Sequence, residues 1–209
     1  MRKDKINVAV LVSGGGTNLQ AIIDAEKSGI IHSAKIALVI SNNPNAYAIQ
    51  RAKDASIDTY VVSKKDYTSQ EDYENAMIEL IKKYEIDLIV LAGFMVILGN
   101  NFIKKFENRI INVHPSLIPS FCGDGFFGLK VHEAALKKGV KVTGATVHYV
   151  TTDVDAGPII AQKAVQVFDD DTPEILQQRV MKEAEHIILP NSIQNISEEM
   201  VKNVWFKKN

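Results

Sequence analysis

The chain has a single cysteine, almost no net charge and no long apolar run, and each of these shortages excludes a class of protein. Cys122 alone cannot form an intramolecular disulfide or supply a thiolate zinc site. A formal net charge of −1 gives no electrostatic reason to expect a nucleic acid partner, because phosphate binding depends on accumulated lysine and arginine. The apolar run Val8 to Val12 is too short for a signal peptide core, and no stretch approaches a membrane span. We therefore expect a cytoplasmic protein without a nucleic acid or membrane partner.

The rest of the composition, 46% hydrophobic and 23% charged, is that of a globular protein with a substantial core. Apolar, β-branched runs alternate with segments of helical spacing, which predicts an α/β fold with a doubly wound, Rossmann-like, mostly parallel sheet of about seven strands. We find no linker or repeat, so residues 1–209 are expected to form a single domain. The expected strands cover residues 6–12, 35–41, 58–62, 86–92, 109–114, 142–150 and 158–167. The expected helices cover residues 19–27, 45–54, 69–84, 97–106, 130–138 and a last segment from about 172.

The last helix has a clear predicted start and an interruption near its end. Asp171 or Thr172 can cap its N-terminus, and Pro173 suits the first turn. Pro190 has no N–H group to donate, so it should kink or end the helix and leave an amphipathic tail at residues 192–205.

A glycine-rich loop at residues 13–18 (SGGGTN) follows the first strand and opens the first helix. Backbone amides at a helix N-terminus form an anion site, and the side chains of Thr17 and Asn18 can add hydrogen bonds. The loop is not a Walker loop, because no Gly-Lys-Ser/Thr follows. It also fits a dinucleotide fingerprint badly, since Leu19 takes the third glycine position and no acidic residue follows the second strand. A monophosphate is the better ligand, and a plain tight turn is the alternative.

The segment at residues 111–119 (INVHPSLIP) places an amide and an imidazole two positions apart at a strand end. Residues two apart on a strand face the same side, so Asn112 and His114 should share one pocket, where α/β sheets bind ligands. A structural histidine is the alternative for His114 considered alone. The remaining histidines are weaker candidates, although His148 alternates along a strand and could line the pocket; the others are His32, His132 and His186.

A carboxylate that could orient His114 lies in the segment at residues 151–158 (TTDVDAGP). Asp153 and Asp155 compete for this role, and aspartate before Ala-Gly-Pro is also an ordinary turn composition. Asp155 is favoured over an ordinary turn residue only because a carboxylate here could act together with His114. Amide, imidazole and carboxylate together suit acyl transfer, and we expect no metal site.

Four segments of the sequence occur in the same order as similar segments in one enzyme family. The chain resembles the phosphoribosylglycinamide formyltransferases, the folate-dependent glycinamide ribonucleotide transformylases of purine synthesis, over about residues 6–190. The Asn-x-His-Pro-Ser-Leu-x-Pro element marks the wider formyltransferase superfamily, and the glycine-rich loop with Thr17 and Asn18 points to the branch that uses a ribonucleotide. The segments that carry the resemblance are 13–20 (SGGGTNLQ), 91–95 (LAGFM), 112–119 (NVHPSLIP) and 155–158 (DAGP).

The resemblance implies catalytic roles for three residues. Asn112 and His114 would stabilise the oxyanion formed when the substrate amine attacks the formyl carbon of 10-formyltetrahydrofolate, and such a donor commonly contributes about 10²–10³ in rate. Asp155 would orient His114 and help to move the amine proton through water. An adjacent carboxylate should raise the pKa of His114 and favour an imidazolium. Because the amine must attack as the free base, the rate should rise and then fall with pH.

The resemblance also implies two binding regions, with the ribonucleotide held largely by the N-terminal half and the folate by the C-terminal half with its catalytic loop. The residues for the ribonucleotide and its phosphate are Gly15, Gly16, Thr17, Asn18 and Glu185. The residues for the folate are Phe94, Met95, Val96, Ile97, Leu98, Asn112 and Asp155. Val96 and Gln70 stand where the family often has basic residues associated with the folate tail, and nearby Lys64 or Lys65 would substitute for them.

Four other functions compete with this interpretation. Methionyl-tRNA formyltransferase would need a further domain and a basic surface, and formyltetrahydrofolate hydrolase a regulatory domain before residue 6. A nicotinamide-dependent oxidoreductase is disfavoured by Leu19. A non-catalytic phosphate-binding protein has no need of Asn112, His114 and Asp155 together. The expected partners are therefore the two small-molecule substrates, glycinamide ribonucleotide and 10-formyltetrahydrofolate, and the chain is expected to be a monomer or weak homodimer.

Overall fold

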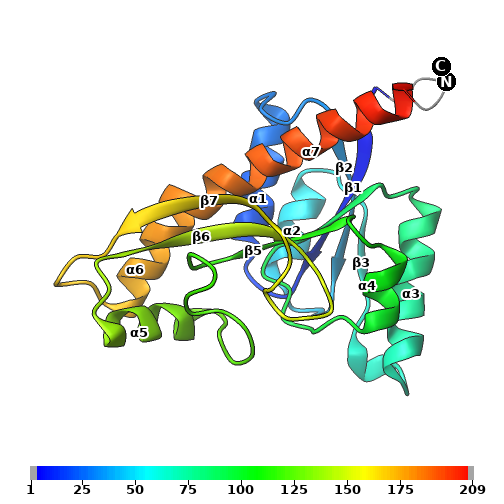
Figure 1. The fold of residues 1–209 in the computed structure, drawn as a ribbon. Coiled ribbons are helices and arrows are strands. Elements are labelled where there is room, and N and C mark those ends of the chain that lie inside the picture. Colours follow the sequence, from blue (N-terminus) through cyan, green and yellow to red (C-terminus); the bar gives the residue numbers. More distant parts are fainter. Residues whose placement is uncertain (1–3, 207–209) are drawn as a thin grey trace.

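The computed structural model describes residues 4–206 and contains one seven-stranded sheet with helices on both faces (Figure 1). The strands follow the spatial order β3-β2-β1-β4-β5-β6-β7. Strands β1 to β5 are parallel, whereas β6 is antiparallel to β5 and β7 is antiparallel to β6. The strands are β1 (Ile6–Val12), β2 (Ala34–Ser41), β3 (Thr59–Val61), β4 (Leu88–Leu91), β5 (Ile110–His114), β6 (Val142–Tyr149) and β7 (Ile159–Gln166). The predicted doubly wound, mostly parallel sheet is confirmed.

The helices pack on the two faces because the buried strands are apolar on both sides. Alternate residues of β1 divide between two core clusters: Val8 and Val10 pack with α1 and α7, whereas Ala9 and Leu11 pack with α3 and α4. The helices are α1 (Thr17–Lys27), α2 (Tyr47–Asp54), η1 (Lys64–Asp66), α3 (Gln70–Lys83), α4 (Asn100–Lys105), α5 (Leu129–Lys138), α6 (Pro173–Val180), η2 (Met181–Glu185) and α7 (His186–Phe206).

The strand order reverses between β1 and its neighbour β4, which is the usual ligand position in an open α/β sheet. The loop after β1 contains the glycine-rich segment, and the loop after β4 contains residues 92–99. Both loops leave the carboxyl ends of their strands, so the fold brings them to the same edge of the sheet. This edge also receives the end of β5, with Asn112 and His114.

The C-terminal helical region differs from the prediction at Pro190. Thr172 caps α6 as expected, since its Oγ1 accepts from the Ile175 N–H at 3.3 Å. The prediction that Pro190 could end the helix is wrong, because α7 continues through Pro190 to Phe206. A proline removes one backbone hydrogen bond, but Leu189, Ile193 and Ile196 on α7 are buried in the core. Packing therefore outweighs the local preference. The residues just before α7 form a π-helical turn, η2.

Candidate active site

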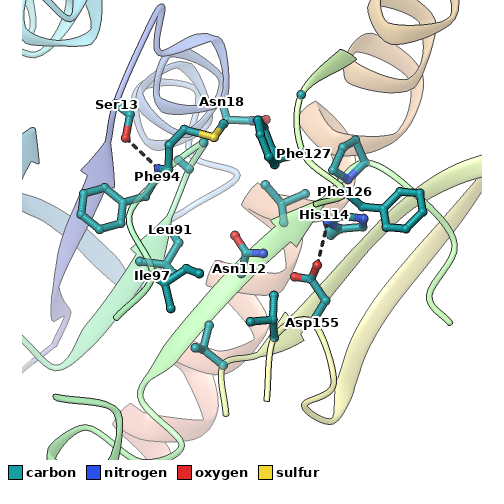
Figure 2. A pocket seen from close by; sticks show the side chains of 18 of the residues that line it. Ser13, Asn18, Leu91, Phe94, Ile97, Asn112, His114, Phe126, Phe127 and Asp155 are labelled. Atoms are coloured by element: carbon teal, nitrogen blue, oxygen red, sulfur yellow. Dashed lines mark hydrogen bonds and ion pairs between the residues drawn. The ribbon is translucent and has the colours of Figure 1, made fainter. Parts of the chain in front are cut away.

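A cavity of about 780 Å³ lies at the carboxyl ends of β1, β4 and β5. In Figure 2, Asn112 lies near its centre, with Leu91 and Ile97 on one side and His114 with Phe126 and Phe127 on the other. The structure brings every site residue expected from the sequence to the wall of this one cavity. These residues are Gly15, Gly16, Thr17, Asn18, Phe94, Met95, Val96, Ile97, Leu98, Asn112, His114, Asp155 and Glu185.

His114 is a buried imidazole with partners on both ring nitrogens. Its Nε2 lies 2.9 Å from the carbonyl oxygen of Phe121, and its Nδ1 lies 3.3 Å from Asp155 Oδ2. Because a carbonyl oxygen can only accept, the Nε2 atom carries the proton. Phe121 therefore selects the tautomer of His114, and Asp155 faces the other side of the ring.

The protonation of His114 differs from the sequence-based expectation. Burial lowers the pKa of His114, and although the Asp155 carboxylate and the Phe121 carbonyl raise it, the net pKa lies below the ordinary value. The expected contribution of Asp155 is confirmed, but the expected net rise in this pKa is wrong, because the side chain is only 5% exposed and loses more hydration than the carboxylate replaces. His114 is consequently neutral at pH 7 and donates through its Nε2–H.

Asp155 rather than Asp153 reaches the two site histidines. Its backbone adopts a left-handed conformation, with φ of 54°, and its Oδ2 accepts from the Gly123 N–H at 3.1 Å. Gly157 holds the same loop against β6, since a Cβ atom there would lie 1.8 Å from the carbonyl oxygen of Tyr149. Burial alone would raise the pKa of Asp155, but its polar contacts, among them the hydrogen bond from the Gly123 N–H, lower it below the ordinary value. The carboxylate is therefore ionised.

His148 joins the amide and the carboxylate of the site, and sequence reasoning ranked it too low. Its Nδ1 lies 2.9 Å from the carbonyl of Tyr149, so Nδ1 donates and Nε2 is free to accept. Asn112 Nδ2 donates to that Nε2 at 3.2 Å, and Asp155 Oδ1 lies 3.6 Å away. The register that places Asn112 opposite His148 across β5 and β6 creates this contact. The alternation along the strand was the only sequence signal for it.

The glycine-rich loop ends in an open helix N-terminus. Gly16 is the N-cap of α1 with φ of 71°, and among residues 4–206 no side chain caps this helix by a hydrogen bond. A Cβ atom on Gly16 would lie 2.6 Å from the Ala48 Cβ, so the close approach of α2 requires glycine. The first amides of α1 thus face the cavity without a capping group, which suits an anion.

The polar side chains of the loop are engaged within the chain. Asn18 Nδ2 donates to Glu185 Oε2 at 2.6 Å, and Thr17 Oγ1 donates to Met181 Sδ at 3.1 Å. Both contacts join α1 to the π-helical turn η2. Burial raises the pKa of Glu185, although the bond from Asn18 opposes this change. Hydrogen bonds from Thr17 and Asn18 to a phosphate therefore remain a prediction.

The segment after β4, residues 94–98, forms an apolar wall of the cavity, and side chains from other segments hold its backbone by hydrogen bonds. Met95 N donates to Ser13 Oγ at 2.8 Å, and Gln70 Nε2 donates to the Ile97 carbonyl at 3.3 Å. Gln70 also donates to Glu74 Oε1 at 2.6 Å, so it supports the wall rather than facing a ligand tail. Met95 and Ile97 remain 57% and 70% exposed, which leaves apolar surface for a ligand to cover.

Across the described residues, no group of three or more histidine, cysteine, aspartate or glutamate side chains is arranged to hold a metal ion. None of the helices in the described chain is both long and apolar enough to cross a membrane.

Comparison with known proteins agrees with this geometry. The family model described as formyl transferase matches residues 6–193. Phosphoribosylglycinamide formyltransferase of Haemophilus influenzae is 42% identical over 183 residues, which are 88% of this chain and 83% of that protein. The trifunctional purine biosynthetic protein adenosine-3 of Homo sapiens is 44% identical over 93% of this chain, but the chain spans only 19% of that protein.

Solved structures give the same result. Glycinamide ribonucleotide transformylase 1 from Symbiobacterium toebii superposes with a TM-score of 0.87 at 42% identity, covering 94% of this chain and 89% of that one. The family resemblance inferred from the sequence segments is thereby confirmed. The chain belongs to the formyl transferase family.

Proposed function

We propose that the chain transfers the formyl group of 10-formyltetrahydrofolate to the amine of glycinamide ribonucleotide, giving formylglycinamide ribonucleotide and tetrahydrofolate in purine (IMP) biosynthesis. The observation that carries the proposal is a single cavity that joins Asn112, His114 and Asp155 to an open helix N-terminus. The three side chains suit formyl transfer, and the helix N-terminus suits binding of a phosphate. The names of the relatives agree with formyl transfer to a glycinamide ribonucleotide.

The cavity fits the two substrates by size and chemistry. A volume of about 780 Å³ is within the range of small-molecule sites. The amides of Gly15, Gly16 and Thr17 bind the phosphate of the ribonucleotide, and Glu185, held by Asn18, lies beside them. The wall at residues 94–98, with Asn112 and Asp155, receives the folate.

Asn112 and His114 supply the donors for the developing oxyanion. When bound, 10-formyltetrahydrofolate supplies the formyl carbon that the amine attacks. Asn112 Nδ2 has one N–H on His148 and a second N–H to donate, so His148 fixes the direction of the amide. The Nε2–H of His114, which donates to the Phe121 carbonyl in the free protein, donates its hydrogen bond to the oxyanion instead.

Asp155 accepts the proton that the attacking amine loses and returns a proton to the departing nitrogen. The attacking amine loses one proton and the departing nitrogen gains one, so a carboxylate that accepts and returns one proton balances the step. Its low pKa keeps the carboxylate ionised to receive the proton through water, and its charge stabilises His114 whenever the ring becomes protonated.

The organisation of the protein follows from this assignment. Residues 1–209 form one formyltransferase domain that works in the cytoplasm as a monomer or weak homodimer. The N-terminal half supplies most ribonucleotide contacts, and the C-terminal half supplies the catalytic loop with Asp155. The bond between Asn18 and Glu185 joins the two halves at the phosphate end.

The test is a transfer assay that follows tetrahydrofolate release with and without glycinamide ribonucleotide. Release that requires the ribonucleotide and disappears in Asp155→Ala supports the transformylase. Release without the ribonucleotide would instead identify a formyltetrahydrofolate hydrolase. No release under either condition would leave a binding protein or a different formyl acceptor.

A further inference from the structure

A third imidazole, His132 on α5, lies at the wall of the cavity and takes no part in the mechanism above. Its side chain is 1% exposed, so it is almost completely buried. Within the described chain, neither its Nδ1 nor its Nε2 has a hydrogen-bond partner. His114 and His148, the other imidazoles at this cavity, use both ring nitrogens.

An unpartnered buried imidazole is costly to keep, because its polar atoms have lost water and gained nothing in return. A phenyl ring would fill the same space without this cost. A polar ring at such a position is therefore expected to find its partner in a molecule that enters the cavity.

The position of His132 indicates which part of a ligand it would meet. Helix α5 packs against α6, which leads directly into η2 with Glu185. In Figure 1, α5 lies on the side of β5 away from α3 and α4, which support the apolar wall at residues 94–98. His132 thus belongs to the wall on the side of Glu185, and His114 is the titratable neighbour that affects its pKa.

We infer that His132 is a substrate-binding residue that holds the glycinamide end of the ribonucleotide by a hydrogen bond to its amide. This inference rests on the proposed function and adds a residue that the mechanism does not require. A neutral imidazole can bind an amide through one ring nitrogen, either by donating to the amide carbonyl or by accepting from the amide N–H. The amine to be formylated belongs to the same glycinamide group, so a fixed amide also fixes the attacking nitrogen beside His114.

His132 binds rather than transfers protons. Burial, together with nearby His114, lowers the pKa of His132 to about 4. A group with this pKa is a poor proton acceptor at neutral pH, whereas its hydrogen bonds remain available in the neutral form.

Three variants and three probes test the inference. His132→Phe keeps a ring and removes both nitrogens, and His132→Asn keeps one donor and one acceptor. His186→Phe is the matched control, because the Nε2 of His186 is also buried without a partner but lies away from the cavity wall. Calorimetry would measure dissociation constants for glycinamide ribonucleotide, for ribose 5-phosphate, which lacks glycinamide, and for a non-reactive folate analogue.

His132→Phe should weaken glycinamide ribonucleotide binding by about 10- to 100-fold. It should leave ribose 5-phosphate and the folate analogue unchanged and should not lower Tm. His132→Asn should recover part of the affinity, and His186→Phe should bind all three probes normally. In ¹⁵N-histidine NMR of the wild-type protein, the His132 ring signals should shift with glycinamide ribonucleotide but not with ribose 5-phosphate.

The inference is overturned if His132→Phe binds glycinamide ribonucleotide as tightly as the wild type. An equal loss for all three probes with a lowered Tm would also overturn it, because that pattern indicates a structural role. Failure of the wild-type protein to bind glycinamide ribonucleotide would instead overturn the proposed function.

Discussion

Replacing Asp155 with asparagine tests the proposed chemistry most directly, because it removes a charge and keeps the shape. Asp155 Oδ2 accepts from Gly123 N–H at 3.1 Å, and an asparagine oxygen can accept the same bond. The loop should therefore keep its conformation, including the left-handed backbone at this residue, which asparagine tolerates well. A change in activity would then report the lost carboxylate.

The expected size of the effect follows from the distances. The carboxylate lies 3.3 Å from His114 Nδ1 and 3.6 Å from His148 Nε2. Because His114 is neutral before the reaction, its charge attraction to this carboxylate exists only while the ring is protonated, and about 5 kcal/mol for a unit charge pair at an effective dielectric of about 20 is then the upper limit of the loss. Loss of a positioned proton acceptor commonly costs about 10²–10⁴ in rate. We expect kcat to fall by about 10³-fold, with little change in the KM for the ribonucleotide and a smaller effect on the KM for the folate, whose site Asp155 also lines.

The assay is ribonucleotide-dependent tetrahydrofolate release, with Asp153→Asn as the control on the same loop. Titration of His114 by NMR gives a second result, since the Asp155 charge raises this pKa and its removal should lower the pKa further. A fall in kcat of less than tenfold, with the His114 pKa unchanged, would refute the assigned role.

Three further predictions follow. Asn18→Ala should weaken ribonucleotide binding about tenfold but spare folate-analogue binding in calorimetry, because it releases Glu185. The rate should rise as the amine deprotonates and show no fall up to pH 9 in a pH–kcat profile, because neutral His114 still donates. The pKa of His132, about 4 when folded, lies below its unfolded value. Acidification from about pH 6.5 to 4 should therefore destabilise the wild type by about 3 kcal/mol more than His132→Phe in urea unfolding.

Most of the fold could be predicted because short apolar runs in the local sequence indicate which strands are buried. Continuous apolar runs such as residues 6–12 and 35–41 require cover on both faces, which defines a parallel strand. The seven expected strands agree with the described ones to within two residues at each end. Pro190 misled the prediction, because the burial that carries α7 past it comes from residues distant in the sequence.

From residue chemistry alone the site could be predicted only within one segment, and the family resemblance supplied the grouping of separate segments. Asn112 and His114 lie two apart on β5, so alternation placed them in one pocket. His148 contacts Asn112 only because β6 runs antiparallel to β5 in one particular register. His132 likewise reaches the cavity through the packing of α5 on α6. Pairing and packing between separate segments had no local signal.

The protonation of His114 shows why this limit matters for mechanism. The sequence identified the carboxylate beside the ring, and from that alone an imidazolium was expected. Burial is the larger effect, and it depends on every segment that closes the cavity around His114. A neutral ring with its proton held on Nε2 by Phe121 offers a donor over the whole range in which the amine is unprotonated. The substrate amine, not His114, should therefore set the pH dependence of the reaction.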